Sequence, residues 1–175
     1  MYVSKRTAVA MLTAAALSGS AASAVTALAH QRGQDRAPGH DEHGNGLALF
    51  TSLAPSVPSD PTLLGAMAGG VPWVLRSGEA KLSNDGRLTV DIRGLLIASG
   101  QFAGTTGPVK TVSTSLYCAD NSTPVGTSGA VPLSSDGDAR VTTMLTLPAK
   151  CQIPALLIHP NGGLGVYIAT SGSGG

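Results

Sequence analysis

Residues 78–95 read GEAKLSNDGRLTVDIRGL, and the fold class can be inferred from their pattern. From Arg87 to Arg93 apolar and polar residues alternate, so that Leu88, Val90 and Ile92 would face one way. Such alternation is typical of an antiparallel strand with one face buried and the other in solvent. Asp85-Gly86 comes directly before the strand and favours a tight turn, which predicts a hairpin with the residues ahead of it.

The same period of two recurs through the rest of the chain. It is found around Trp73 and over residues 112–118, 141–147 and 164–168, and Asp136-Gly137 supplies a second hairpin signal. The 23 glycines and 11 prolines also favour many turns. We therefore expect an all-β fold, a small antiparallel β-sandwich of about seven or eight strands over residues 69–172, followed by a flexible tail at 173–175.

The first 29 residues predict an export signal. Lys5 and Arg6 precede the apolar run Ala8 to Leu17, and Ala27-Leu28-Ala29 forms a cleavage signal, with a second candidate cut after Ala24. The alternative is a membrane anchor, but the apolar run is short against the roughly 20 residues that a span needs. We expect residues 1–29 to be a signal peptide, the protein to be secreted and extracellular with a bacterial style of leader, and no membrane insertion after cleavage.

Residues 30–68 are expected to be a spacer and an extended arm. Residues 30–46 contain almost nothing apolar and so cannot offset the entropy of ordering. Residues 47–68 contain apolar side chains, but Pro55, Pro58 and Pro61 interrupt them and argue against a helix or a central strand. One turn of helix is expected over 63–68.

Cys118 and Cys151 are the only two cysteines of the chain. An even number of cysteines in an exported chain favours a disulfide, and with two cysteines only one intramolecular pairing exists. Closing a loop of this length adds roughly 3–4 kcal/mol of stability in the chain-entropy model. The alternative is a reactive thiol, for which the only support is Lys150 beside Cys151.

The histidines are the weak candidates for a metal site. His40 and His43 flank two acidic residues in the spacer, but a specific site needs three or four ligands on a scaffold, which the spacer lacks. His159 follows the apolar run 156–158 and precedes a Pro-Asn-Gly turn. We interpret it as a strand-end histidine bonded to backbone, with a ligand or general base as the alternative. No metal and no cofactor are predicted.

Charge and motifs exclude several functions. A net charge of +1 gives no field that attracts nucleic acid, and aromatic residues, at 3%, are too few for stacking platforms. Residues 104–110 resemble a phosphate loop only faintly, because Pro108 removes a backbone donor. No nucleophile–base pair is visible, so we expect no enzyme. Trp73, the single tryptophan, is expected to pack in the core.

Residues 78–95 resemble the opening of chordin-type (CHRD) domains, which run G-x-A-x-L through a turn to a strand that ends in Gly-Leu. The resemblance implies an extracellular β-sandwich that is usually non-enzymatic. The His-Ile-His motif that follows in that family is absent, and residues 115–118 read SLYC about where it would fall. The resemblance therefore transfers no site residues.

Together these features predict an exported, non-enzymatic β-sandwich that acts as an extracellular interaction or surface module. Its partner, a protein or a surface ligand, is unknown, and no nucleic acid is expected. The loops 97–108 and 119–128, rich in Gly, Ser and Thr, would make the contacts. The alternative is a protein that binds a metal or a small ligand through His159 or through the segment of His40 and His43.

Overall fold

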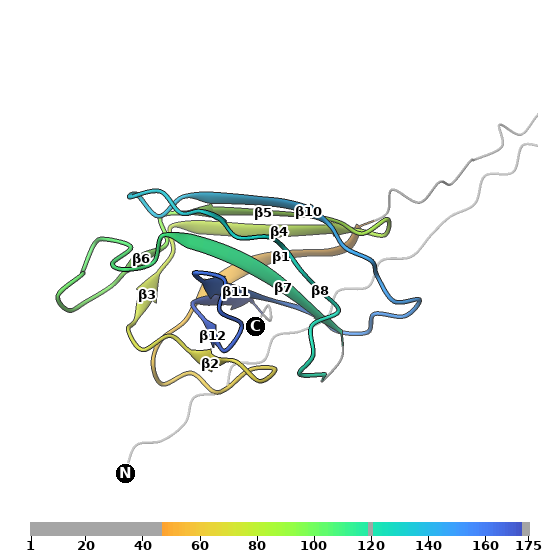
Figure 1. Ribbon diagram of the computed structural model, residues 1–175, viewed down its shortest axis with the longest axis horizontal. Coiled ribbons are helices and arrows are strands. Elements are labelled where there is room, and N and C mark those ends of the chain that lie inside the picture. Colours follow the sequence, from red (N-terminus) through yellow and green to blue (C-terminus); the bar gives the residue numbers. More distant parts are fainter. Residues whose placement is uncertain (1–46, 119–120, 173–175) are drawn as a thin grey trace, which may run out of the picture. The chain divides into compact units, whose positions relative to one another are not determined.

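The computed structural model describes residues 47–118 and 121–172, which form thirteen β-strands (Figure 1). The expected all-β, antiparallel fold with one disulfide is confirmed. No helix long and apolar enough to span a membrane occurs in the described part of the chain. The signal peptide and spacer predicted for residues 1–46 and the tail at 173–175 lie outside the described residues.

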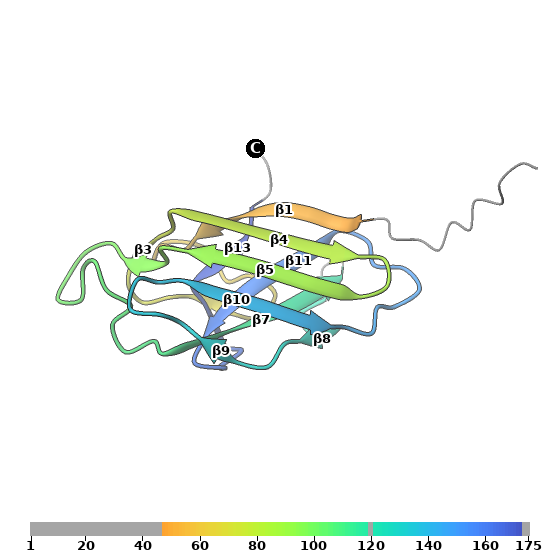
Figure 2. The ribbon, with the colours of Figure 1, turned by 90° about the horizontal axis from the view of Figure 1, so that it is seen from above.

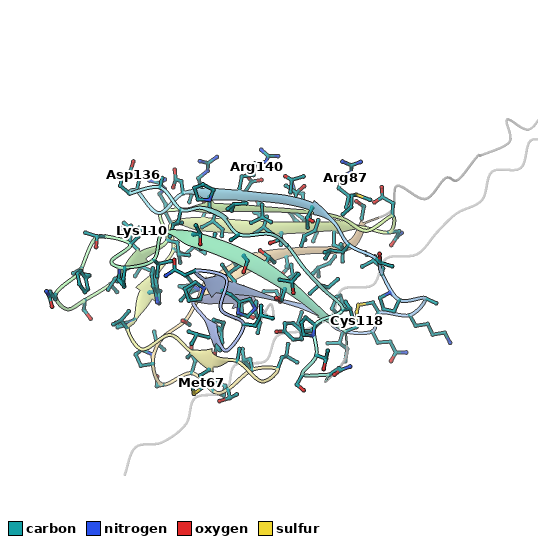
Figure 3. The ribbon with its side chains drawn as sticks, viewed as in Figure 1. Met67, Arg87, Lys110, Cys118, Asp136 and Arg140 are labelled. Atoms are coloured by element: carbon teal, nitrogen blue, oxygen red, sulfur yellow. A yellow bond between two sulfur atoms is a disulfide. The ribbon has the colours of Figure 1, made fainter. Side chains whose placement is uncertain are left out.

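The first layer of the sandwich contains four antiparallel strands in the order β10, β5, β4, β1 (Figure 2). Their bounds are β1, Leu47–Pro55; β4, Ser77–Ser83; β5, Arg87–Arg93; and β10, Ala139–Met144. As the alternation at 87–93 predicts, Leu88, Val90 and Ile92 are fully buried. The outer face is polar: Arg140 pairs with Asp91 at 3.6 Å and, like Arg87, points away from the second layer (Figure 3).

The second layer continues from the end of β1 through β13, β11 and β7, and two short strands, β8 and β9, pair with β7. Their bounds are β7, Thr111–Cys118; β8, Gly126–Thr127; β9, Val131–Pro132; β11, Pro154–Pro160; and β13, Ala169–Ser171. Four strands of two residues form two separate pairs, β2 with β12 and β3 with β6. They are β2, Met67–Ala68; β3, Trp73–Val74; β6, Leu96–Ile97; and β12, Val166–Tyr167.

The expected boundary at residue 69 is wrong, because the sheet begins at Leu47. β1 pairs with β4 up to Ser52, opposite Glu79, and with β13 from Leu53, opposite Ser171. It therefore belongs to both layers and is not an arm. Pro55, the last residue of β1, pairs on one side only, and a missing N–H is tolerated there.

Residues 56–68 form a strap over the outer face of the second layer, and no helical turn is found at 63–68. Leu64 and Gly65 take positive φ in a tight turn that joins Leu63 to Ala66 by two backbone hydrogen bonds. Under the strap, Ala66, Tyr117, Leu157 and Tyr167 form a second apolar cluster. β7 is therefore buried on both faces, whereas alternation alone predicted one.

The two Asp-Gly turns differ in what they connect. The turn at 84–86 closes the β4–β5 hairpin, as expected. The turn at 135–137 also forms, with the Gly137 N–H donating to the Ser134 carbonyl at 3.0 Å. However, β9 pairs with β7 and β10 pairs with β5, so this turn joins the two layers and does not close a hairpin.

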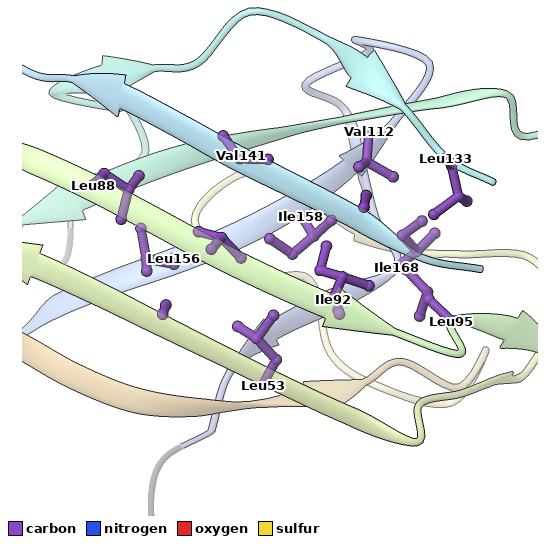
Figure 4. Close-up of a cluster of buried hydrophobic side chains, with 14 of the residues drawn as sticks. Leu53, Leu88, Ile92, Leu95, Val112, Leu133, Val141, Leu156, Ile158 and Ile168 are labelled. Atoms are coloured by element: carbon purple, nitrogen blue, oxygen red, sulfur yellow. The ribbon is translucent and has the colours of Figure 1, made fainter. Parts of the chain in front are cut away.

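The core lies between the layers and draws side chains from every long strand (Figure 4). Fully buried aliphatic side chains from β5 meet those of β11, and Ile168 and Leu95 close one end. Burying such side chains is the main source of stability in a fold of this size.

The disulfide fastens the connection between β10 and β11 to the last residue of β7. Cys118 and Cys151 have Cα atoms 4.9 Å apart. The bond lies at the opposite end of β7 from Lys110 (Figure 3). The predicted pairing is thus confirmed, and among the described residues no cysteine is free.

Gly86 and Gly100 form a matched pair for a test of the hairpin. Both have φ of 90°, but a Cβ at Gly86 would overlap the carbonyl oxygen of Leu145, whereas a Cβ at Gly100 meets open space. We expect Gly100→Ala to lower the unfolding free energy by about 1 kcal/mol from backbone strain alone. Gly86→Ala should cost at least about 1 kcal/mol more, because the clash adds to the strain. Denaturant titration measures both, and equal costs would contradict the turn geometry.

Removing the disulfide should lower the unfolding free energy by about 3–4 kcal/mol, because 33 residues separate the two cysteines and the bond restricts the unfolded chain. The measurement compares the Cys118→Ala, Cys151→Ala double variant with the wild type in urea. With reductant present, the two proteins should unfold at nearly the same urea concentration. A wild type that keeps its advantage in reductant would show that the alanines, and not the lost bond, cause the difference.

Candidate functional site

An apolar recess of about 250 Å³ opens at the end of the sandwich where β7 begins. The loop of residues 98–108 projects from β6 at this end (Figure 1). The recess lies between this loop, the pair β3–β6, the residues ahead of β3 and the residues around β12. It is lined by Gly69, Gly70, Val71, Trp73, Ile97, Phe102, Pro108, Val109, Pro160, Val166 and Ile168.

The deep wall of the recess is part of the main core. Trp73, Ile97 and Ile168 are all buried and pack within it. The expectation that Trp73 packs in the core therefore holds, and one side of the same residue faces the recess. At the rim, Phe102 remains 46% exposed. A buried apolar floor and an aromatic side chain at the rim are common in sites that bind small molecules.

Backbone hydrogen bonds hold the 98–108 loop that carries Phe102. Ile97 donates its N–H to the Thr105 carbonyl at 2.9 Å and accepts from the Gly104 N–H at 2.8 Å. Phe102 also lies against Gly107. The loop is therefore fastened to β6 at its base, and the position of the Phe102 ring is supported from below.

Asn161 fixes the backbone where the 98–108 loop leads into β7. It takes a φ of 50° in the turn after β11, and its Oδ1 accepts hydrogen bonds from the N–H groups of Lys110 at 2.9 Å and Thr111 at 3.2 Å. These bonds fix Pro108 and Val109, which line the recess, against the end of β11. The sequence predicts the turn but not this role, because the bonded partners are about 50 residues distant.

Gly69 allows the backbone to lie against the indole of Trp73. A Cβ at this position would stand 3.0 Å from Trp73 Nε1 and 3.3 Å from Ile168 Cγ2. Glycine thus brings the chain close to the wall of the recess, and a larger residue would displace the ring. The indole N–H has no hydrogen-bond partner although Trp73 is only 4% exposed.

The lining of the recess is almost entirely apolar. None of its lining residues is ionisable and none carries a hydroxyl or a thiol. The lining therefore offers no nucleophile, no general base and no metal ligand. What it offers is apolar surface and one aromatic rim residue.

His159 lies within β11 and is completely buried. Its Nδ1–H donates to the carbonyl of Val166 at 2.7 Å, while Nε2 has no partner. Burial lowers the pKa of the imidazole below its usual value, and the bond to Val166 acts in the opposite direction. The ring thus fastens β12, and with it one wall of the recess, to the second layer.

Ser113 stands opposite His159 on β7, and its hydroxyl also has no partner. The pair has the composition of a serine nucleophile and a base. However, Ser113 and His159 are only 2% and 0% exposed. A substrate therefore has no path to the hydroxyl in this structure.

The other candidate residues do not form a metal site among the described residues. No group of three or more His, Cys, Asp or Glu side chains that could hold a metal occurs among residues 47–118 and 121–172. His40 and His43 lie outside the described residues. The segment 104–110 is the faint phosphate-loop candidate. Its Lys110 ammonium donates to the Gly107 carbonyl within the same segment, at 3.3 Å.

No family model, curated protein or solved structure matches the chain. The resemblance of residues 78–95 to chordin-type domains therefore rests on the residues that carry it.

His159 should make the unfolding free energy depend on pH. The unfolded imidazole titrates near pH 6.5, whereas the buried ring has a lowered pKa, so between these values the unfolded state binds more protons. Stability should therefore fall as the pH drops below about 6.5 and level off below the folded pKa. The pKa values of Asp85 and Asp138 are also lowered, by backbone hydrogen bonds to their carboxylates, so these groups act at lower pH.

The control is His159→Asn, which retains a side-chain N–H near the Val166 carbonyl but does not titrate. Urea titrations from pH 4.5 to 8 should show the slope in the wild type and a nearly flat line between pH 5 and 7 in the variant. A slope of equal size in both proteins would assign the effect to another group.

Proposed function

We propose that the chain is an exported, non-enzymatic binding module that captures an apolar group in the apolar recess. The observation that carries this proposal is the lining itself: about 250 Å³ of space without an ionisable side chain, beside a half-exposed Phe102. Sites of this kind bind by burying apolar surface, and the few polar atoms around them select the orientation.

Export is supported by two independent features of the chain. Residues 1–29 have the pattern of a signal peptide. The Cys118–Cys151 disulfide is of the kind that persists outside the reducing cytosol. The local resemblance to chordin-type domains agrees with an extracellular setting.

The binding role follows from how the recess is built. Its floor is part of the core, and its rim lies on the 98–108 loop, one of the two loops from which contacts are expected. Of the alternative functions, small-ligand binding is now favoured at the recess and not at His159. The imidazole is fully buried and serves β12 through the Val166 carbonyl.

A phenyl-substituted chromatography matrix tests the proposal, because an immobilised phenyl ring stands for any apolar group. The chain has two phenylalanines, and both are exposed: Phe102 at the recess and Phe50 on β1. We expect Phe102→Ala to shorten retention clearly and Phe50→Ala to change it little. Removing the Phe102 ring lowers the rim of the recess, whereas Phe50 lies outside the recess, with the Lys81 ammonium 5.2 Å from its ring centre.

The two variants make this test discriminating. Phe50 is the more exposed ring, at 59% against 46% for Phe102. If retention followed exposed apolar surface alone, Phe50→Ala would have the larger effect. That order of effects, with both variants folded by circular dichroism, would overturn the proposed function.

A further inference from the structure

Three segments of the chain around the recess contain no charged residue. Residues 61–75, 94–109 and 160–172 lack Asp, Glu, Lys and Arg. Every residue that lines the recess belongs to one of these three segments. The charged outer face of the first layer, from which Arg140 projects, lies on the opposite side of the molecule from Met67 (Figure 3). The recess is therefore built entirely from uncharged stretches of the chain.

Exposed apolar side chains gather around the recess. Phe102 and Val71 line it and remain exposed. Met67 is exposed as well, and its partner across the β2–β12 pair is Val166, another lining residue. Leu164, also exposed, precedes Val166 by two residues. These five side chains are called the apolar band below. Exposed apolar side chains that gather in one place mark a contact with a ligand, a protein or a membrane.

The turns that carry the apolar band close some of their own backbone hydrogen bonds. In the loop that carries Phe102, the carbonyl of this residue accepts from the Thr105 N–H at 3.1 Å and from the Thr105 hydroxyl at 2.8 Å. A bond from the Gly163 N–H to the Pro160 carbonyl, at 3.1 Å, closes the turn that carries Leu164. A backbone group that leaves water for lipid needs such a partner. These turns can therefore enter the headgroup region of a bilayer at a reduced cost.

The charges that adjoin the first two uncharged segments are of both signs. The residues directly before or after these segments are Asp60, Arg76, Arg93 and Lys110. Arg76 and Arg93 share the carboxylate of Asp138, at 3.5 Å and 3.3 Å. Two acids thus stand beside three cations at the border. A border with both signs and little excess of either matches zwitterionic phospholipid headgroups, which carry a phosphate and an ammonium.

We propose that the apolar band docks on a zwitterionic lipid bilayer and that the recess receives part of an acyl chain there. This inference rests on the proposed function and names the source of the apolar group. A bilayer is favoured over a protein partner because separate turns carry the band, and lipid adapts to an uneven outline. Protein interfaces are also enriched in Arg, which the three uncharged segments lack. The docking is peripheral, with Met67 and Phe102 at the boundary between headgroups and acyl chains.

Flotation with phosphatidylcholine vesicles tests the proposal on the exported, disulfide-bonded chain. A single myristoyl chain holds a protein on a membrane with an association constant of about 10⁴ M⁻¹, and we expect the apolar band to bind with similar strength. Half of the protein should therefore float at about 0.1 mM accessible lipid. Raising NaCl from about 0.1 M to about 0.5 M should change the bound fraction less than about twofold, because apolar contact and not charge attraction supplies the binding.

Two exposed methionines provide a matched pair of variants. Met67 belongs to the apolar band and is 61% exposed, whereas Met144 lies on β10 opposite Arg87 and is 58% exposed. Met67→Glu should weaken vesicle binding at least about tenfold, because its carboxylate would lose hydration at the lipid boundary. Met144→Glu should leave binding unchanged. Equal losses in the two variants, with both folded by circular dichroism, would contradict docking through the band.

Two further results would overturn the inference. The first is a protein that does not float even at ten times that lipid concentration, while retention on the phenyl matrix still depends on Phe102. The proposed function would then stand and the lipid partner would be wrong. The second is a dimer in analytical ultracentrifugation without lipid that Met67→Glu dissociates, which would make a second copy of the chain the occupant. Loss of both flotation and the dependence of retention on Phe102 would reject the proposed function as well.

Discussion

The structure depends on one strand, β1, which carries backbone hydrogen bonds to both layers. Its partners change between Ser52, opposite β4, and Leu53, opposite β13. At the crossing point Gly78 of β4 lies against Leu53, where a Cβ would stand 2.9 Å from that side chain's own Cβ. Only glycine allows this close approach. The approach lies where β1 passes from the first layer to the second.

The position of the recess follows from this crossing. After β1 the chain runs as the strap over the outer face of the second layer and returns to the core at Trp73. The pair β2–β12 then lies over the outer face of the second layer, and the pair β3–β6 lies at the end from which the 98–108 loop projects. Walls made of two-residue strands and loops leave space that long ladders would fill, and the Nδ1–H of His159 and the Oδ1 of Asn161 hold these walls in place.

The sequence predicts the parts of the fold that depend on local alternation and turn chemistry. The β4–β5 hairpin, the burial of Leu88, Val90 and Ile92, and the pairing of the two cysteines follow from patterns within a few residues or from simple counting. β1 is missed because Pro55, Pro58 and Pro61 are read as breakers of the whole segment 47–68, whereas Pro55 stands where the strand pairs on one side only. The burial of β7 on both faces is missed because the strap that covers it comes from a distant part of the chain.

The candidate site is only partly visible in the sequence. The loop 97–108 is predicted to be a contact loop from its composition, but Phe102, Val166 and Ile168 come to line one recess only in the folded chain. The histidine that draws attention in the sequence, His159, acts as a support for the Val166 carbonyl. His159, which is chemically reactive, thus has a structural position, whereas the apolar Phe102 lies at the exposed rim of the recess.

Part of the recess is lined by loop residues outside the long strands, and these residues can be varied by mutation. Phe102, Val71 and Pro108 belong to connections whose side chains contribute little to the sandwich core, and the disulfide lies at the other end of β7. Substitutions at these three positions can therefore reshape the mouth while the framework keeps its stability. A selection experiment could use this scaffold, in the way that antibody frameworks are used, to obtain recesses of different shape.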